Sequence, residues 1–184
     1  MLLNEEECKI KSGSKLVSII MGSDSDLDVM KETAKVLEDF EIPFEMTISS
    51  AHRSPSRTIE YASNASQQGV EIIIAGAGRA AHLAGVIAAH TILPVIGVPI
   101  DSGPLNGVDA LYSTVQMPPG VPVATMAIGS GGGRNAGIFA AQMLALKYPA
   151  LKAKLEDYKS KLAEGVEQKA TRLEEFGYEK YNAE

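Results

Sequence analysis

Residues 16–26 read LVSIIMGSDSD, and this stretch decides the fold of the chain. Its first six residues are mostly apolar and rich in β-branched side chains, which is typical of a strand buried on both faces of a parallel sheet. A polar turn follows. From about Asp26 to Phe40 apolar residues then recur at helical spacing, with Ser25 or Asp24 as a suitable N-cap. The order strand, turn, helix indicates an α/β fold.

The same unit recurs along the chain. We expect further strands at 44–49, 71–75, 95–98 and 122–128, and helices at 55–68, 80–91, 109–115 and 135–147. Ser54 and Pro55 stand in the order preferred for an N-cap and a first helical residue. The alternation predicts a three-layer α/β/α sandwich around a parallel five-stranded sheet, flavodoxin- or Rossmann-like, with right-handed crossovers.

With 184 residues, the chain is expected to form a single domain over 1–184, with the α/β core at 16–147 and a helical arm at 150–176. The arm is highly charged but carries a narrow apolar stripe, formed by Leu151, Leu155, Tyr158, Leu162 and Val166. Because the sheet already has its helices, we expect this stripe to pack on another subunit of a homo-oligomer rather than on its own domain.

The composition is that of an ordinary globular protein, with 45% hydrophobic and 22% charged residues and a net charge of −6. The acidic balance argues against nucleic-acid binding, because that binding depends on basic residues that neutralise phosphates. The apolar stretch at 80–100 holds two histidines and two prolines, so a buried helix and strand explain it better than a membrane span. The polar N-terminal segment has no signal-peptide core, and we expect a cytoplasmic protein without a membrane partner.

Several classes of site have no support in the sequence. Cys8 is the only cysteine, which excludes an intrachain disulfide and a cysteine metal cluster. The three histidines lack a clustered carboxylate partner, so we predict no metal site. A Gly-x-Ser-x-Gly elbow is absent, so hydrolase chemistry is not indicated.

Polar turns follow the first three predicted strands, at Gly22–Asp26, Ser50–Pro55 and Gly76–His82. In an open parallel sheet these turns emerge at one edge, where ligands bind. We therefore expect their hydroxyl, carboxylate, imidazole and guanidinium groups to meet in one crevice.

The first two turns suit a sugar phosphate and a proton transfer. Ser23 and Ser25, beside N–H groups at a helix N-terminus, can hold a phosphate, whereas Asp26 would repel it and suits a ribose hydroxyl. Arg53 matches phosphate geometry, and His52 belongs to the residue type that titrates near neutrality. Each turn taken alone could equally be a helix cap or solvated surface; their shared edge favours a site.

The third turn has a competing interpretation. Gly76-x-Gly78-x-x-Ala81 fits the dinucleotide fingerprint, but it follows the third strand rather than the first, and bulky side chains at Arg79 and His82 would crowd a pyrophosphate. Close packing of a helix on a strand explains its small residues as well. The glycine-rich segment at 129–133 lacks the lysine of a triphosphate loop and is expected to be a flexible connection or lid.

Together these motifs resemble the N5-carboxyaminoimidazole ribonucleotide mutase family of purine biosynthesis. The resemblance covers residues 16 to about 147 and is carried by residues 21–26, 50–53, 74–78, 80–83, 115–118 and 120–123. It implies a cofactor-free, metal-free isomerase that makes 4-carboxy-5-aminoimidazole ribonucleotide by decarboxylation and recarboxylation. The family forms octamers with C-terminal helices that reach neighbouring subunits, so a homo-octamer is implied as well.

The resemblance also implies roles for individual residues. His52 would shuttle the proton and Asp26 would bind the ribose. The phosphate would be held by Ser23, Ser25 and Arg53, with Ser50 also in the substrate site. A small, dry pocket for the carboxylate and CO2 would be lined by Gly76, Ala77, Gly78, His82 and Leu83.

Two positions depart from the family pattern. Arg79 stands where the family usually has glycine, and Ala84 where it usually has proline. In having arginine after Gly78, the third turn resembles that of a related branch that carboxylates aminoimidazole ribonucleotide directly with CO2. That branch, however, tends to have Ala-His-Lys where this chain has Ala51-His52-Arg53. The mutase is therefore the preferred prediction, with direct carboxylation as the alternative and a dinucleotide-binding or regulatory α/β module as a more distant one.

Overall fold

The computed structural model describes residue 10 and residues 13–181, so the predictions made for Cys8 and for the first residues of the chain lie outside the described part. Five parallel strands form one sheet in the order β2-β1-β3-β4-β5. Their bounds are Val17–Met21 for β1, Phe44–Ile48 for β2, Ile72–Gly78 for β3, Val95–Ile100 for β4 and Ala124–Thr125 for β5. This is the flavodoxin-like order, and it confirms the predicted fold class.

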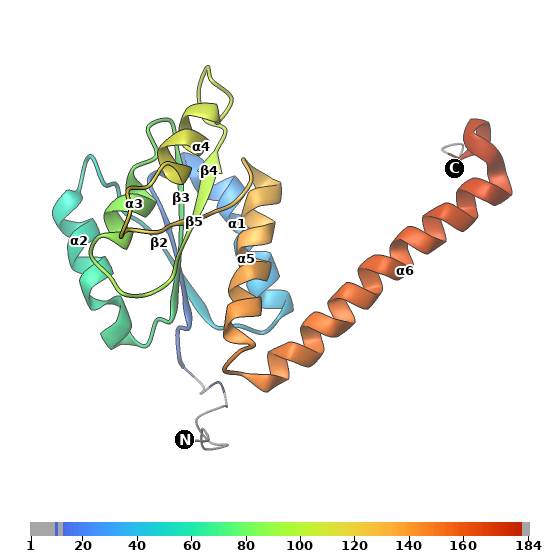
Figure 1. The fold of residues 1–184 in the computed structure, drawn as a ribbon, viewed down its shortest axis with the longest axis horizontal. Helices are drawn as coiled ribbons and strands as arrows, with labels where there is room; N and C mark the ends of the chain where they lie inside the picture. Colours follow the sequence, from blue (N-terminus) through green and yellow to red (C-terminus); the bar gives the residue numbers. More distant parts are fainter. Residues whose placement is uncertain (1–9, 11–12, 182–184) are drawn as a thin grey trace.

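Helices cover both faces of the sheet (Figure 1). Successive side chains of a strand point to opposite faces, so Ile19 belongs to one core cluster and Ile20 to the other. The first cluster includes residues of α1 (Leu27–Asp39) and α5 (Ser130–Leu144), and the second includes residues of α2 (Pro55–Asn64) and α3 (Leu83–Ala88). A further helix, α4 (Val108–Val115), packs along β4 and β5. The result is three layers.

The glycine-rich segment is not the predicted lid. Helix α5 begins at Ser130 rather than at Asn135, so Gly131, Gly132 and Gly133 form its first turn. A Cβ on Gly132 would lie 1.7 Å from the carbonyl oxygen of Ala127, and one on Gly133 would lie 2.7 Å from the carbonyl oxygen of Val29. These glycines therefore allow close approach of backbones, and the loop prediction was wrong because it took a packing requirement for flexibility.

Other elements also differ in extent from the prediction. Strand β3 continues to Gly78, because residues as far as Gly78 pair in register with β4 as far as Ile100. Helix α3 covers only 83–88 of the predicted 80–91, and β5 covers only 124–125 of the predicted 122–128. β5 is an edge strand preceded by prolines at 118, 119 and 122, which cannot donate ladder hydrogen bonds.

The helix caps also differ. Ser23, rather than Ser25 or Asp24, caps the 3₁₀ turn at Asp24–Asp26 that leads into α1, and it forms a capping box with Asp26. Pro55 is the first residue of α2 as predicted, but the Ser54 hydroxyl donates to the carbonyl of Ser50 at 3.1 Å instead of capping the helix.

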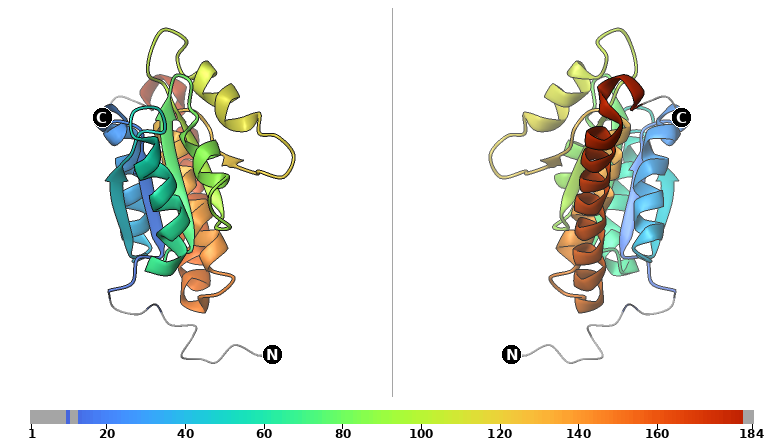
Figure 2. Two further views of the ribbon diagram at one scale, coloured as in Figure 1. Left: turned by 90° about the vertical axis from the view of Figure 1, so that its left-hand side faces the viewer. Right: turned by 90° about the vertical axis from the view of Figure 1, so that its right-hand side faces the viewer.

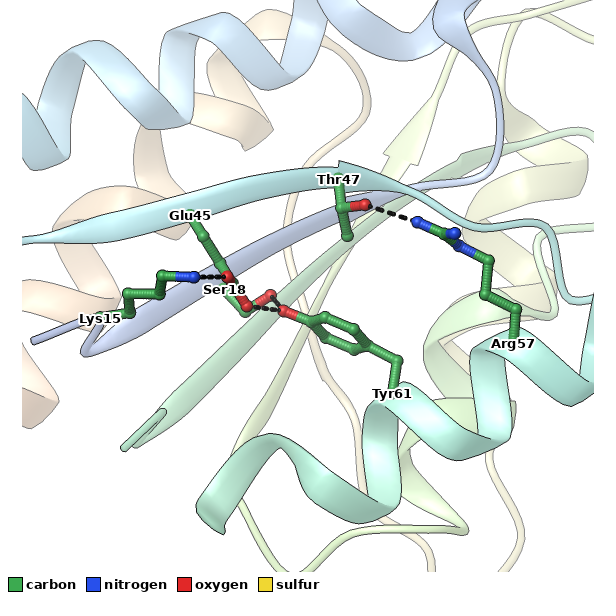
Figure 3. A network of polar contacts seen from close by, with 6 residues as sticks. All are labelled: Lys15, Ser18, Glu45, Thr47, Arg57 and Tyr61. Carbon is green, nitrogen blue, oxygen red and sulfur yellow. Dashed lines mark hydrogen bonds and ion pairs between the residues drawn. The ribbon is translucent and has the colours of Figure 1, made fainter. Parts of the chain in front are cut away.

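A polar network fixes α2 to the sheet (Figure 3). The Tyr61 hydroxyl contacts both the buried Ser18 of β1 and the carboxylate of Glu45 on β2, and Lys15 donates to Glu45 at 2.7 Å. Burial raises the pKa of Glu45, but hydrogen bonds from Lys15 and Tyr61 outweigh burial and hold it below its ordinary value. Because α2 directly follows the second turn, this network helps to set the position of that turn.

The C-terminal helix α6 (Pro149–Lys180) leaves the body of the molecule (Figure 1), and it overlaps the body when viewed from the side toward which it extends (Figure 2, right). Only the first part of the predicted apolar stripe packs on its own chain. Leu151 and Leu155 are 2% and 9% exposed. The ring of Tyr158 meets the ring of Phe40 edge to face, with 5.6 Å between the ring centroids. Leu162 and Val166 are 54% and 63% exposed. At Gly177, φ is 67° and the helix turns sharply (Figure 1).

Within the described residues, none of the helices combines the length and the apolar character needed to cross a membrane.

We predict that Gly132→Ala lowers the free energy of unfolding by about 3 kcal/mol, because the new Cβ would overlap a backbone carbonyl that cannot move without shifting α5. Gly131→Ala is the matched control: nothing lies within 4 Å of its Cβ, and alanine should stabilise the helix by up to about 1 kcal/mol. Urea unfolding of both variants measures the difference. Equal stability of the two variants would contradict the proposed packing.

Candidate active site

The turns after β1, β2 and β3 meet in one cleft of about 660 Å³ at the carboxyl edge of the sheet. The cleft is lined by ten of the predicted site residues: Ser23, Ser25, Asp26, Ser50, His52, Arg53, Ala77, Gly78, His82 and Leu83. Gly76 does not line it. A Cβ at this position would lie 2.3 Å from the sulfur of Met30, so the glycine accommodates α1 beneath the sheet.

The turn after β1 is built around a buried carboxylate. Asp26 is 4% exposed, accepts a hydrogen bond from the Ser23 amide at 3.0 Å and another from the Ser25 hydroxyl at 3.4 Å. Burial raises the pKa of Asp26, and these hydrogen bonds offset only part of the rise. The buried carboxylate of Asp26 has lost hydrogen bonds to water, and a ligand hydroxyl that donates to it would replace one of them.

The turn after β2 places a guanidinium against the turn after β1. The backbone N–H and the Nε of Arg53 donate to the Ser50 hydroxyl at 3.2 and 3.4 Å, and its Nη2 donates to the carbonyl of Gly22 at 3.1 Å. No carboxylate of the described residues is within ion-pair distance of this group. Its remaining N–H groups are available to an anion beside the hydroxyls of Ser23 and Ser25.

Two imidazoles that line the cleft contact each other. His52 Nε2 lies 2.8 Å from His82 Nδ1, and the rings are nearly perpendicular, at 81°, with centroids 4.9 Å apart. In such a pair one nitrogen donates and the other accepts, so each ring fixes the orientation of the other. Both side chains are exposed to the cleft, which leaves their other nitrogens able to exchange protons with a ligand.

Small residues form the floor of the cleft. A Cβ on Gly78 would lie 1.7 Å from the Ser102 hydroxyl oxygen, so Gly78 and Ser102 share one space. Leu83 is 2% exposed and closes the floor with an apolar side chain. The lining residues that the sequence analysis gave no role in the site are Gly22, Ala51, Arg79, Ala80 and Ser102. Ser102 follows β4, so the rule that predicted the other turns could also have included it.

The dinucleotide interpretation finds no support in this geometry. Gly76 and Gly78 lie inside β3 rather than in a turn that opens a helix, and α3 begins only at Leu83. Among the described residues, no group of three or more histidine, cysteine, aspartate or glutamate side chains is arranged to hold a metal ion. That the protein works without a metal or cofactor stays a prediction.

Comparison with known proteins gives consistent matches. The family model described as AIR carboxylase matches residues 16–165. The N5-carboxyaminoimidazole ribonucleotide mutase of Pyrococcus horikoshii is 57% identical over 95% of this chain and 98% of its own. The phosphoribosylaminoimidazole carboxylase of Candida glabrata is 54% identical over 98% of this chain but only 30% of its own. The crystal structure of Treponema denticola PurE superposes with a TM-score of 0.77 and 26% identity, covering 86% of this chain and 98% of that one.

We predict that Asp26→Asn stabilises the fold relative to the parent protein, increasingly so as the pH rises. A carboxyl whose pKa is raised on folding costs stability above that pKa, and this cost disappears below 3.8, the ordinary pKa of aspartate. The difference in unfolding free energy should therefore grow between pH 3.8 and the raised pKa and then level off. Denaturant unfolding across this range measures it, and a constant difference would contradict the assigned cause.

Proposed function

The chain belongs to the AIR carboxylase family, and we propose that it converts N5-carboxyaminoimidazole ribonucleotide to 4-carboxy-5-aminoimidazole ribonucleotide in purine biosynthesis. The observation that carries the proposal is the placement of His52 in one cleft with Ser23, Ser25 and Gly78. The relative matched over nearly its whole length is named a mutase, whereas the carboxylase is matched over less than a third of its length. This difference favours the isomerase over direct carboxylation.

The reaction moves one carboxylate and needs one proton shuttle. When the N–C bond to the carboxylate breaks, CO2 forms and the exocyclic nitrogen takes up a proton. When the neighbouring ring carbon attacks CO2, a C–C bond forms and that carbon gives up its proton. One side chain can serve both steps. It acts as an acid when it delivers a proton in the first step, and as a base when it recovers a proton in the second.

His52 fits this role, since it is exposed to the cleft and its ring is oriented by the hydrogen bond to His82. Arg53, Ser23 and Ser25 bind the phosphate, and Asp26 accepts from a ribose hydroxyl. Ala77, Gly78 and Leu83 line the same cleft, and these small or apolar residues suit the retention of CO2 between the two steps.

We also propose that the protein is a homo-oligomer, as the resemblance implies. Between Leu155 and the turn at Gly177, α6 runs on for about 32 Å and carries an exposed stripe formed by Leu162, Val166, Leu173 and Phe176. A second exposed apolar row lies at and before α4, formed by Leu105, Val108, Tyr112 and Val115. Surfaces of this kind on two elements are typical of subunit contacts. The proposal that the oligomer has eight subunits rests on the family resemblance alone.

The cytoplasmic location is part of the same proposal. The substrate carries a phosphate and a carboxylate, and an ion of this kind does not cross membranes unaided. An enzyme that uses it is therefore expected where the nucleotide is made.

We predict that His52→Asn lowers kcat by at least about 10³-fold while the affinity for the product nucleotide changes little, because asparagine keeps a polar side chain but cannot shuttle a proton. His90→Asn is the matched control: His90 is exposed outside the cleft, and its ring contacts the carbonyl of Val86 at 2.8 Å. Absorbance at the product band follows the reaction, and near-parental turnover by the His52 variant would refute the mechanism.

The same assay separates the isomerase from a direct carboxylase. The isomerase should make product rapidly from N5-carboxyaminoimidazole ribonucleotide and slowly from aminoimidazole ribonucleotide with bicarbonate. The reverse preference would identify the chain as a carboxylase.

We predict that the double change Leu162→Glu and Val166→Glu dissociates the oligomer, because it places two charges in an apolar contact. Thr171→Glu is the control, since residue 171 lies on the opposite side of α6. Sedimentation velocity measures the mass of each variant. A parental protein that sediments as a monomer, or an unchanged mass in the double variant, would contradict the proposed contact.

A further inference from the structure

Arg79 lines the cleft but has no role in the proposed reaction. It follows β3 directly, and its φ is 56°, in the left-handed region that residues with a Cβ avoid. A glycine would adopt this backbone without strain. The chain therefore keeps a large, charged side chain in the cleft at a cost to its backbone, and such strain is common where a side chain serves a ligand.

The guanidinium of Arg79 has no polar partner among the described residues. No hydrogen bond or ion pair joins it to any of the described residues, and its Cζ lies 3.7 Å from the position that a Cβ on Gly103 would take. Arg53, by contrast, already donates to Ser50 and Gly22. Arg79 thus offers up to five donors and no acceptor to whatever enters the cleft, and it selects for an anion.

The two arginines lie toward different ends of the cleft. Arg53 donates to Gly22 after β1, whereas Arg79 packs against Gly103 after β4, with β3 between these strands. Adjacent strands are about 4.8 Å apart, so the two anchoring turns are separated by roughly 10 Å. One phosphate cannot pair fully with both groups. A ligand with an anion at each end can.

We propose that Arg79 binds the carboxylate of the carboxylated nucleotide, at the end of the cleft opposite to the phosphate. This inference rests on the proposed function, whose substrate and product both carry a phosphate at one end and a carboxylate at the other. The carboxylate loses its charge when CO2 forms, so Arg79 stabilises bound substrate and product more than the transition state. Its contribution is to specificity, by favouring carboxylated nucleotides over the bare one.

Calorimetric titration of the full chain with two ligands tests this role. Arg79→Met keeps the length of the side chain and the backbone strain but removes the charge. It should weaken binding of 4-carboxy-5-aminoimidazole ribonucleotide roughly 10- to 100-fold and leave binding of aminoimidazole ribonucleotide unchanged. The affinity of the Arg79→Lys variant for 4-carboxy-5-aminoimidazole ribonucleotide should lie between those of the parental protein and the Arg79→Met variant. In turnover KM and kcat should both rise, because the lost contact stabilises bound substrate more than the transition state. Arg134→Met, an exposed arginine outside the cleft, is the control.

Two outcomes would overturn the assignment. Equal weakening for both nucleotides would place Arg79 on the phosphate, and unchanged affinity for both would remove it from the site. Circular dichroism verifies that each variant is folded. A parental protein that binds neither nucleotide would instead refute the proposed function, and this would be evident before any variant is compared.

Discussion

The parallel pairing of the first three strands is the constraint on which the site depends. Met21 at the end of β1 is aligned with Ile48 of β2 and with Gly76 of β3. The chain therefore leaves these strands at nearly the same level, and side chains far apart in sequence come within hydrogen-bond distance. The contact between His52 and His82, thirty residues apart, is a direct result. A shift of one residue in either pairing would turn the strand side chains to the other face and separate the turns.

The elements whose signals are local could be predicted closely from the sequence. β1 was expected at 16–21 and is found at 17–21, and α1 was expected at 26–40 and is found at 27–39. Periodicity and turn residues determine such elements. The cleft residues followed from one further rule, that turns after parallel strands share an edge. The gathering of these residues in one cleft was thus predictable from the sequence, although their hydrogen bonds were not.

The remaining features depend on neighbours distant in sequence. Gly132 belongs to a helix because the carbonyl of Ala127 occupies its side-chain space, and no local pattern distinguishes this from a flexible loop. The stripe on α6 is continuous in the sequence, yet it divides after Tyr158, where contact with Phe40 ends. Arg79 was noticed as a departure from a pattern, but its strained backbone and its lack of a partner required the structure.

Gly78 and Ser102 have a consequence for how this enzyme can diverge. The serine hydroxyl occupies the volume that any side chain on Gly78 would need, so the ends of β3 and β4 are interlocked. Replacement of the glycine is tolerable only after the serine has been lost, and a larger residue at 102 requires the glycine to be kept. Among descendants of this chain, the two positions should be inherited as a correlated pair, and the order in which they mutate should be restricted.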